Sequence, residues 1–320
     1  MDKINVFAYA EPRQFLTDFV EHKKSLKPDW SLGLWAHKLG LSGTASISRL
    51  LSGERVPGSD LTKTLIEYFQ FSQEEANYFS RLWERERFYR SGVFPNPVAL
   101  LIKNARTLVL SGILDKEKVS AFLAPLNLEP VFFNDVVVGS VNVNTYSETS
   151  FGVFNESHVC ITAKPKNSGL LDAGLFFCGY TYSNAEALRQ SQEKWGYEID
   201  LASIQMQNDR ERIDVRLNPS QDLFFSLPLQ NRSFSKVDER YELFGYSDTP
   251  TGLFKAKFLI DSIGRETPFN SQTDHFSLSA NGPAAKILQQ LDFQPLKWVI
   301  HENLFSAVYE PMNPKLLGSY

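Results

Sequence analysis

Hydroxyl and guanidinium side chains that could contact DNA lie close together between residues 42 and 55. Ser and Thr hydroxyls hydrogen-bond to phosphates or base edges, and Arg binds both. We expect Thr44, Ser46 and Arg49 to contact bases or phosphates, and Arg55 to contact the DNA backbone. The full set of predicted DNA-binding residues is Ser42, Thr44, Ser46, Ser48, Arg49 and Arg55.

These polar residues need two short helices to position them, and residues 31–57 have the matching pattern. Ser31 is a typical N-cap, Ala36 is small enough for a second helix to approach, and Gly40 suits the turn. Ile47 and Leu50 would then pack the second helix on the core. The pattern therefore predicts a helix-turn-helix. The alternative is a helical bundle with a similar turn, in which the polar residues are only solvated.

The first 90 residues show helical periodicity beyond this segment. Apolar stripes follow Pro12 and Ser59, and Ser72 to Glu75 has the spacing of a capping box. Five short helices predict a compact all-α domain over residues 1–95. The prolines at 95 and 97 interrupt helix, so we place the boundary there and assign residues 96–320 to a second domain.

Residues 31–57 resemble the phage-repressor-like helix-turn-helix pattern, with Trp35 in place of a leucine. The wider segment 4–90, which opens with Phe7, Tyr9, Arg13 and Phe15, also resembles a bacterial family of transcriptional regulators. This resemblance implies a protein that binds double-stranded DNA as a homodimer, with half-sites about one helical turn apart.

The second domain has the period of β-strands over most of its length. A helix is expected over residues 98–110, and alternation begins after residue 131, for example at Val137, Gly139, Val141 and Val143. Phe254, Ala256, Phe258 and Ile260 alternate in the same way, and one further helix is expected over residues 184–195. These patterns predict a sheet-rich domain with few helices.

Residues 119–311 resemble the acetoacetate decarboxylase family. The similarity lies in residues 123–130, in residues 146–149 and above all in residues 180–197. It implies a cone-shaped β-barrel around a cavity for a small keto acid. The fold class expected for the whole chain is therefore multidomain α + β, an all-α helix-turn-helix domain followed by an acetoacetate decarboxylase-like β-barrel.

The same resemblance implies that this chain lacks the family's chemistry. In the family, one of two adjacent lysines forms a Schiff base with the ketone. Ile199 and Asp200 occupy those two positions here, and neither side chain can form an imine. A retained pocket would contain Glu148, Tyr182, Trp195, Ile199 and Asp200, although Glu148 could equally be a surface carboxylate. Asp200 would repel a carboxylate, so acetoacetate is not the expected ligand.

Overall composition restricts the remaining classes of function. Residues 1–95 hold 13 Lys and Arg against 12 Asp and Glu, whereas the rest of the chain holds 20 against 25, so a DNA partner is neither favoured nor excluded by charge. The two cysteines and five histidines form no metal-binding motif, and we expect no metal or cofactor. No apolar run or leader pattern indicates a membrane, so a cytoplasmic protein is expected.

Three functions remain open at this stage. The first is a DNA-binding transcriptional regulator whose barrel is a pseudoenzyme that senses a small metabolite. The second is a decarboxylase or lyase that acts on a small keto acid through another residue, such as Lys164, Lys194, Lys255 or Lys257. The third is a scaffold that binds other proteins, for which the sequence offers no positive feature.

Overall fold

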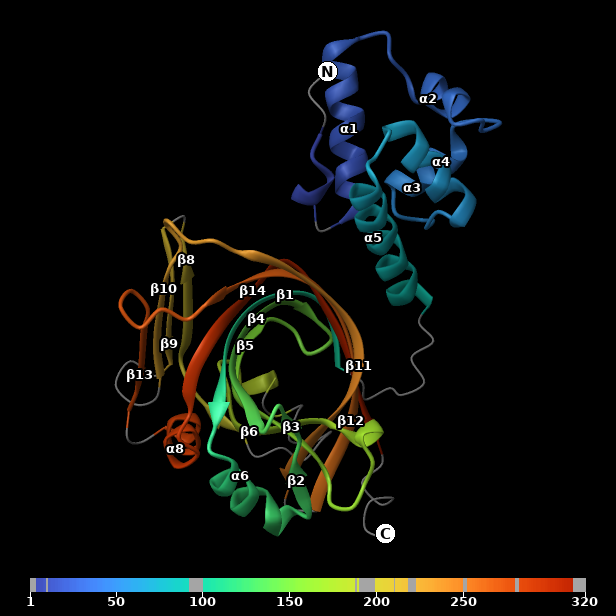
Figure 1. Ribbon diagram of the computed structural model, residues 1–320. Coiled ribbons are helices and arrows are strands. Elements are labelled where there is room, and N and C mark those ends of the chain that lie inside the picture. Colours follow the sequence, from blue (N-terminus) through green and yellow to red (C-terminus); the bar gives the residue numbers. More distant parts are fainter. Residues whose placement is uncertain are drawn as a thin grey trace. The chain divides into compact units, whose positions relative to one another are not determined.

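The computed structural model describes residues 4–9, 11–91, 100–187, 189, 199–209, 211–217, 223–249, 252–279 and 282–312 (Figure 1). The chain divides into two compact units, residues 1–94 and residues 95–320. The first is helical and the second consists mainly of β-strands, and each is described by itself below. No helix among the described residues is long and apolar enough to cross a membrane.

Helices of the first unit begin and end at the residues that local capping favours. The helices are η1 (Val6–Ala8), α1 (Pro12–Leu26), α2 (Leu32–Lys38), α3 (Ala45–Leu51), α4 (Ser59–Phe69) and α5 (Gln73–Ser91). The Ser31 hydroxyl accepts a hydrogen bond from the Leu34 amide, and Gly40 has a φ of +68° after α2. Ser72 and Glu75 form the reciprocal bonds of a capping box. The predicted starts of α2 and α5 and the predicted turn after α2 are therefore confirmed.

An aromatic core holds the helical unit together. Phe15, on α1, packs edge-on against Phe69 and Phe79, at centroid separations of 5.0 and 5.7 Å. Trp35, on α2, is fully buried and lies 5.1 Å from the ring of Phe19. Ala36, Ile47 and Leu50 are each 1% exposed. The apolar positions of the sequence pattern therefore face the core.

The main sheet of the second unit closes on itself. Its strands follow the order β5, β4, β1, β14, β12, β11, β6, and β6 pairs with both β11 and β5. These strands are β1 (Leu100–Leu114), β4 (Val136–Thr149), β5 (Phe154–Pro165), β6 (Gly174–Tyr182), β11 (Ser235–Thr249), β12 (Gly252–Pro268) and β14 (Gln294–Met312). The sheet is therefore a barrel. The short strands β2 (Leu128–Pro130), β3 (Phe132–Phe133) and β7 (Asp200–Leu201) extend it at the margins.

A smaller antiparallel sheet and two helices accompany the barrel. The sheet has the order β13 (His275–Leu278), β10 (Leu223–Pro228), β9 (Arg212–Leu217), β8 (Ile204–Asn208). The other elements are α6 (Lys116–Leu123), η2 (Ala124–Leu126), η3 (Leu170–Asp172) and α8 (Pro283–Gln290). The smaller sheet, α6 and α8 share one apolar core with the outward-facing side chains of β1, β4 and β5. The barrel strands therefore carry buried residues on both faces.

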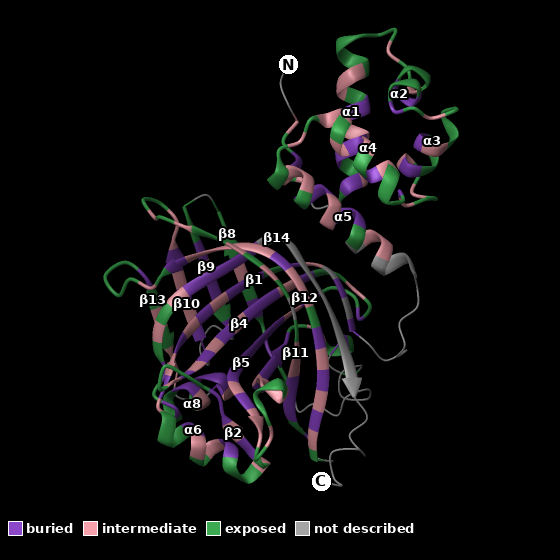
Figure 2. Cartoon of the chain, turned by 45° about the vertical axis from the view of Figure 1, so that its right-hand side comes forward, coloured by how far each residue is buried: buried purple, intermediate pink, exposed green. Residues whose placement is uncertain are grey.

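Burial along the barrel strands alternates as the sequence predicts. In β4, Val137, Gly139, Val141 and Val143 are buried between less buried neighbours, and β12 alternates in the same way (Figure 2). The expected helix over residues 98–110 is wrong, because residues 100–114 form β1. β1 pairs with β4 on one side and with β14 on the other. These long-range hydrogen bonds outweigh its local helical preference.

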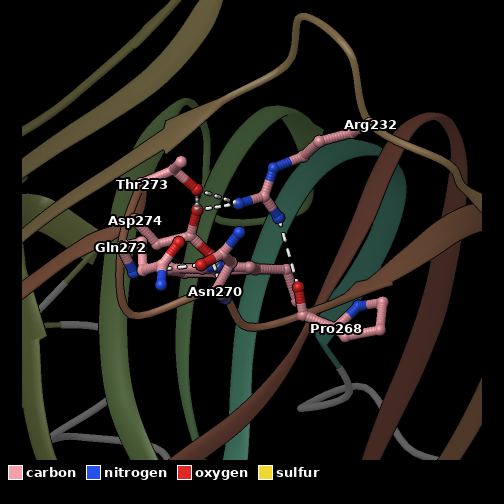
Figure 3. A network of polar contacts seen from close by, with 7 residues as sticks. Arg232, Pro268, Asn270, Gln272, Thr273 and Asp274 are labelled. Atoms are coloured by element: carbon pink, nitrogen blue, oxygen red, sulfur yellow. Dashed lines mark hydrogen bonds and ion pairs between the residues drawn. The ribbon is translucent and has the colours of Figure 1, made fainter.

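A buried ion pair between Arg232 and Asp274 connects the segment before β11 with the segment between β12 and β13. Arg232, which precedes β11, pairs with the carboxylate of Asp274, and it also donates to the carbonyl oxygen of Pro268 at 3.2 Å (Figure 3). The other oxygen of Asp274 accepts from the indole N–H of Trp298 at 2.8 Å and from the amide of Asn270 at 2.9 Å. The side chains of Arg232 and Asp274 are 9% and 0% exposed, so water screens this pair little.

Candidate ligand-binding site

Strand register places polar side chains in rows on the inner wall of the barrel. Directly opposite residues of an antiparallel pair lie on the same face. Ser111 is opposite both Lys297 and Ser140, and Ser140 is opposite Cys160. The first row therefore runs across β14, β1, β4 and β5.

Two further rows follow at intervals of two residues. Val109 is opposite Val299 and Asn142, and Asn142 is opposite His158. Two residues further along β1, Thr107 is opposite His301 and Asn144, and Asn144 is opposite Glu156. Since side chains two residues apart point to the same face, all three rows face the interior.

All residues of these rows except Glu156 line a cavity of about 220 Å³ inside the barrel. Apolar side chains from β6, β11 and β12 form the opposite wall, namely Leu175, Phe177, Leu243, Phe258 and Ile260. Glu239 and Lys297 also line the cavity, and their side chains are 35% and 44% exposed. The cavity therefore has one polar wall and one apolar wall, as small-molecule sites commonly have.

A chain of contacts connects three buried polar groups in this wall. The Tyr146 hydroxyl donates to Oε2 of Glu156 at 2.5 Å. Oε1 of the same carboxylate lies 3.0 Å from Nδ1 of His158, a close ion-pair distance without the alignment of a hydrogen bond. Burial by itself would lower the pKa of His158, but the adjacent Cys160 and Glu156 outweigh it and raise this pKa to about 10. His158 is therefore an imidazolium at neutral pH.

Cys160 and Thr107 are the other polar groups of note in this wall. The side-chain amide of Asn142 donates to Sγ of Cys160 and to Oγ of Ser140, in both cases at 3.1 Å. Oγ1 of Thr107 is buried without a hydrogen-bond partner among the described residues. A buried hydroxyl that lacks a partner costs about 1–3 kcal/mol, so a ligand that bonded to it would recover part of that free energy.

His301 lies opposite Thr107 on β14, and its pKa is lowered whereas that of His158 is raised. Burial lowers the pKa of His301 to about 4, a shift that a hydrogen bond with the Ile263 backbone only partly offsets. Its Nε2 atom lies 3.8 Å from Oε2 of Glu239, and burial raises the pKa of that carboxyl group. The cavity thus contains one charged and one neutral histidine at neutral pH.

The low pKa of His301 predicts acid sensitivity. As pH falls from 6.5 towards 4, the unfolded chain binds a proton at His301 that the folded chain does not. The unfolding free energy should therefore fall by about 1.4 kcal/mol per pH unit more in the wild type than in His301→Phe. Urea denaturation at several pH values measures both slopes. His275→Phe, at an exposed histidine of β13, is the matched control. Equal slopes for the wild type and His301→Phe would contradict the prediction.

The residues predicted to line a ligand pocket have the following positions. Tyr182 and Ile199 are buried in an apolar cluster of the barrel, 1% and 8% exposed, while Glu148 and Asp200 are exposed. Trp195 lies outside the described residues. None of the other four lines the 220 Å³ cavity. Several cavity residues do have a signal in the sequence, because Ser140, Asn142 and Asn144 alternate with buried valines in β4, and His158 and Cys160 flank the buried Val159 in β5.

The residues predicted to bind DNA surround α3. Ser42 and Thr44 precede this helix, and Thr44 is its N-cap residue. Ser46, Ser48 and Arg49 lie on it, and Arg55 follows it. Ser46 is half-buried, and the other five residues are exposed.

Comparison with known proteins finds solved structures with a partial likeness to this chain. No protein-family model matches the sequence, and no curated protein is detectably similar to it. Acetoacetate decarboxylase from Legionella pneumophila matches with a TM-score of 0.48 and 13% identity, over 71% of this chain and 95% of that chain. The enduracididine biosynthesis enzyme MppR complexed with pyruvate matches with a TM-score of 0.46 and 9% identity, over 67% and 87%.

An acetoacetate decarboxylase-like enzyme from Sphingomonas wittichii RW1 matches at a similar level, with a TM-score of 0.44 and 11% identity over 67% of this chain and 92% of that chain. Because these TM-scores are all below 0.5 and the identities are at most 13%, function has to be argued from this chain's own residues.

Proposed function

We propose that the protein is a DNA-binding regulator whose barrel binds a small metabolite. The observation that carries the first part is the distribution of side chains around α3. Ile47 and Leu50 are buried, whereas Ser42, Thr44, Ser48, Arg49 and Arg55 are exposed. These polar side chains have the types that contact phosphates and base edges. A homodimer would bind two half-sites about one helical turn apart.

The second part of the proposal rests on the barrel cavity. It has one polar and one apolar wall, and the Thr107 hydroxyl, which has no hydrogen-bond partner among the described residues, is suited to bond a ligand. Its volume of about 220 Å³ is below the usual range of drug-sized pockets, about 300–1,000 Å³, which favours a small ligand. We therefore place the metabolite in this cavity.

Imine chemistry, the alternative function, has less support from the described lysines. Lys164, Lys255 and Lys257 lie 2.5, 3.5 and 2.9 Å from the carboxylates of Glu129, Asp172 and Glu242, respectively. Each of these three amino groups is therefore held at a carboxylate instead of being free to approach a ketone. Lys297 lines the cavity but is paired with Glu266 at 2.5 Å. Lys194 lies outside the described residues.

DNA binding can be tested with one substitution and a matched control. A duplex selected from a random library would be titrated with full-length protein by fluorescence anisotropy at several salt concentrations. Arg49→Ala should weaken binding by about 1–3 kcal/mol, roughly 5- to 150-fold, because it removes an exposed guanidinium from α3. Lys24→Ala removes the same charge from an exposed position on α1 and should change affinity less than about twofold.

Two outcomes would overturn the DNA-binding proposal. One is the failure of selection to enrich any duplex that the protein binds in a salt-sensitive way. The other is an equal loss of affinity in Arg49→Ala and Lys24→Ala, which would indicate that only net charge matters.

A further inference from the structure

Cys160 belongs to a line of polar side chains on β5. Glu156, His158 and Cys160 occupy alternate positions, so each side chain follows the last by about 6.6 Å on the inner face of the barrel. The Glu156 carboxylate, which accepts a hydrogen bond from Tyr146, lies on one side of His158, and Cys160 adjoins His158 on the other. This is the order of acid, base and thiol found in activated cysteine sites.

The surroundings of Cys160 distinguish it from an ordinary buried thiol. A cysteine beside a histidine has the proton acceptor that nucleophilic attack by sulfur requires. The Asn142 amide points a hydrogen-bond donor at Sγ from 3.1 Å. Moreover, Cys160 lines the same cavity as the Thr107 hydroxyl, for which the described part of the chain offers no hydrogen-bond partner.

The other cysteine of the chain has none of these features. Cys178, on β6, is opposite Val159 rather than Cys160, and its thiol points to a backbone carbonyl oxygen at 3.7 Å. Cys178 packs against the outer apolar core and does not line the cavity. Burial, followed by the nearby Cys160, raises the pKa of its thiol. Cys178 is therefore an internal control for Cys160.

The two walls of the cavity indicate which electrophile would fit. The Ser140 hydroxyl lies directly opposite Cys160, accepts a hydrogen bond from Asn142 and keeps its own O–H to donate to a carbonyl oxygen. Leu175, Phe177 and Phe258 offer apolar contact to a short hydrocarbon portion. A small carbonyl compound with a conjugated double bond can accept the hydrogen bond of the polar wall and contact the apolar wall. It also has a carbon atom that a sulfur nucleophile can attack.

We propose that Cys160 is a reactive thiol that captures small α,β-unsaturated carbonyl compounds in the barrel cavity. This inference rests on the proposed ligand cavity and names the chemistry of its ligand. The Cys160 sulfur forms a bond to the β-carbon, the carbon–carbon π bond breaks, and its electron pair moves to the enolate. The thiol proton, held by His158, then passes to the α-carbon. The product is a saturated thioether, and no oxidant or further reactant is needed.

Methyl vinyl ketone is a suitable probe for the full-length protein. Intact-mass and peptide mass spectrometry would follow the modification of each cysteine over time, in buffer and in guanidinium chloride. We expect one addition in the folded protein, at Cys160, at least about tenfold faster than at Cys178 and faster than at Cys160 in the unfolded chain. Slower reaction of Cys160 in the folded than in the unfolded protein would overturn the proposal.

Substitutions test the role of the histidine and its carboxylate. His158→Gln should slow the modification of Cys160 at least about tenfold, and Glu156→Gln should slow it to a smaller extent. Cys178→Ser should leave the rate unchanged. Unchanged rates in His158→Gln would overturn the assigned role of His158. Should His158→Gln fail to fold, the comparison of folded with unfolded wild type still decides whether the thiol is activated.

A saturated analogue of the probe distinguishes covalent capture by Cys160 from ligand binding in the cavity without a covalent bond. Butan-2-one cannot form the thioether, but it can occupy the cavity. If Cys160 is inert while butan-2-one raises the melting temperatures of the wild type and Cys160→Ser equally, the cavity proposal stands and covalent capture fails. If Cys160 reacts rapidly and Cys160→Ser forms no adduct, covalent capture is supported whatever the result of the DNA titration.

Discussion

Replacing Asp274 with Ala is expected to lower the free energy of unfolding of the barrel unit by about 3–5 kcal/mol. The change leaves Arg232, whose side chain is 9% exposed, without its carboxylate partner, and it removes the acceptor of the Trp298 indole N–H (Figure 3). A buried charge without a partner loses hydration and gains nothing in return. Urea denaturation of the full chain, followed through the β-sheet signal in circular dichroism, measures the change.

Two controls test whether the loss of stability in Asp274→Ala comes from the burial of the ion pair or from the loss of any ion pair. Glu242→Ala breaks the pair of Glu242 with Lys257, whose side chains are 55% and 39% exposed, and should cost at most about 1 kcal/mol. The double substitution Arg232→Met with Asp274→Leu removes both charges and should cost less than Asp274→Ala alone. A loss below about 1 kcal/mol for Asp274→Ala, similar to that for Glu242→Ala, would show that the pair contributes little.

Trp35→Ala is expected to destabilise the helical unit by about 3–5 kcal/mol. Trp35 is fully buried on α2, and its ring lies 5.1 Å from that of Phe19 and 6.2 Å from that of Tyr68. Net stabilities of folded domains are typically about 5–15 kcal/mol, so such a cavity removes a large part of the total. Differential scanning calorimetry should show a lower melting temperature for the helical unit and an unchanged one for the barrel.

A second residue of the same helix provides the control. Leu34→Ala shortens a side chain that is 53% exposed, so its effect should stay within about 0.5 kcal/mol. Trp35→Leu introduces the residue of the resembling helix-turn-helix pattern and should lose less than Trp35→Ala. If Trp35→Ala and Leu34→Ala have equal effects, the assigned position of Trp35 in the core is wrong.

Features that depend on neighbouring residues could be predicted from the sequence. The Ser31 cap, the turn at Gly40 and the capping box of Ser72 and Glu75 each involve groups within a few residues of one another. The alternation of Val137 to Val143 likewise follows from the two-residue period of a strand. In each case, local hydrogen bonding or periodicity determines the outcome, so the residue types alone were sufficient.

Pairing between strands distant in the sequence determined the remaining features, namely strand β1 and the candidate site. Residues 100–114 became a strand because β4 and β14 pair with both of its edges, and no local pattern expresses those partners. The candidate site depends on the same register, since Thr107 meets His301, from the far end of the barrel sequence, only across the β1–β14 pairing. The sequence alone determined which strands carry alternating polar side chains. Only the closed sheet determined that those from β1, β4, β5 and β14 face one cavity, because non-local hydrogen bonds set which residues lie opposite each other.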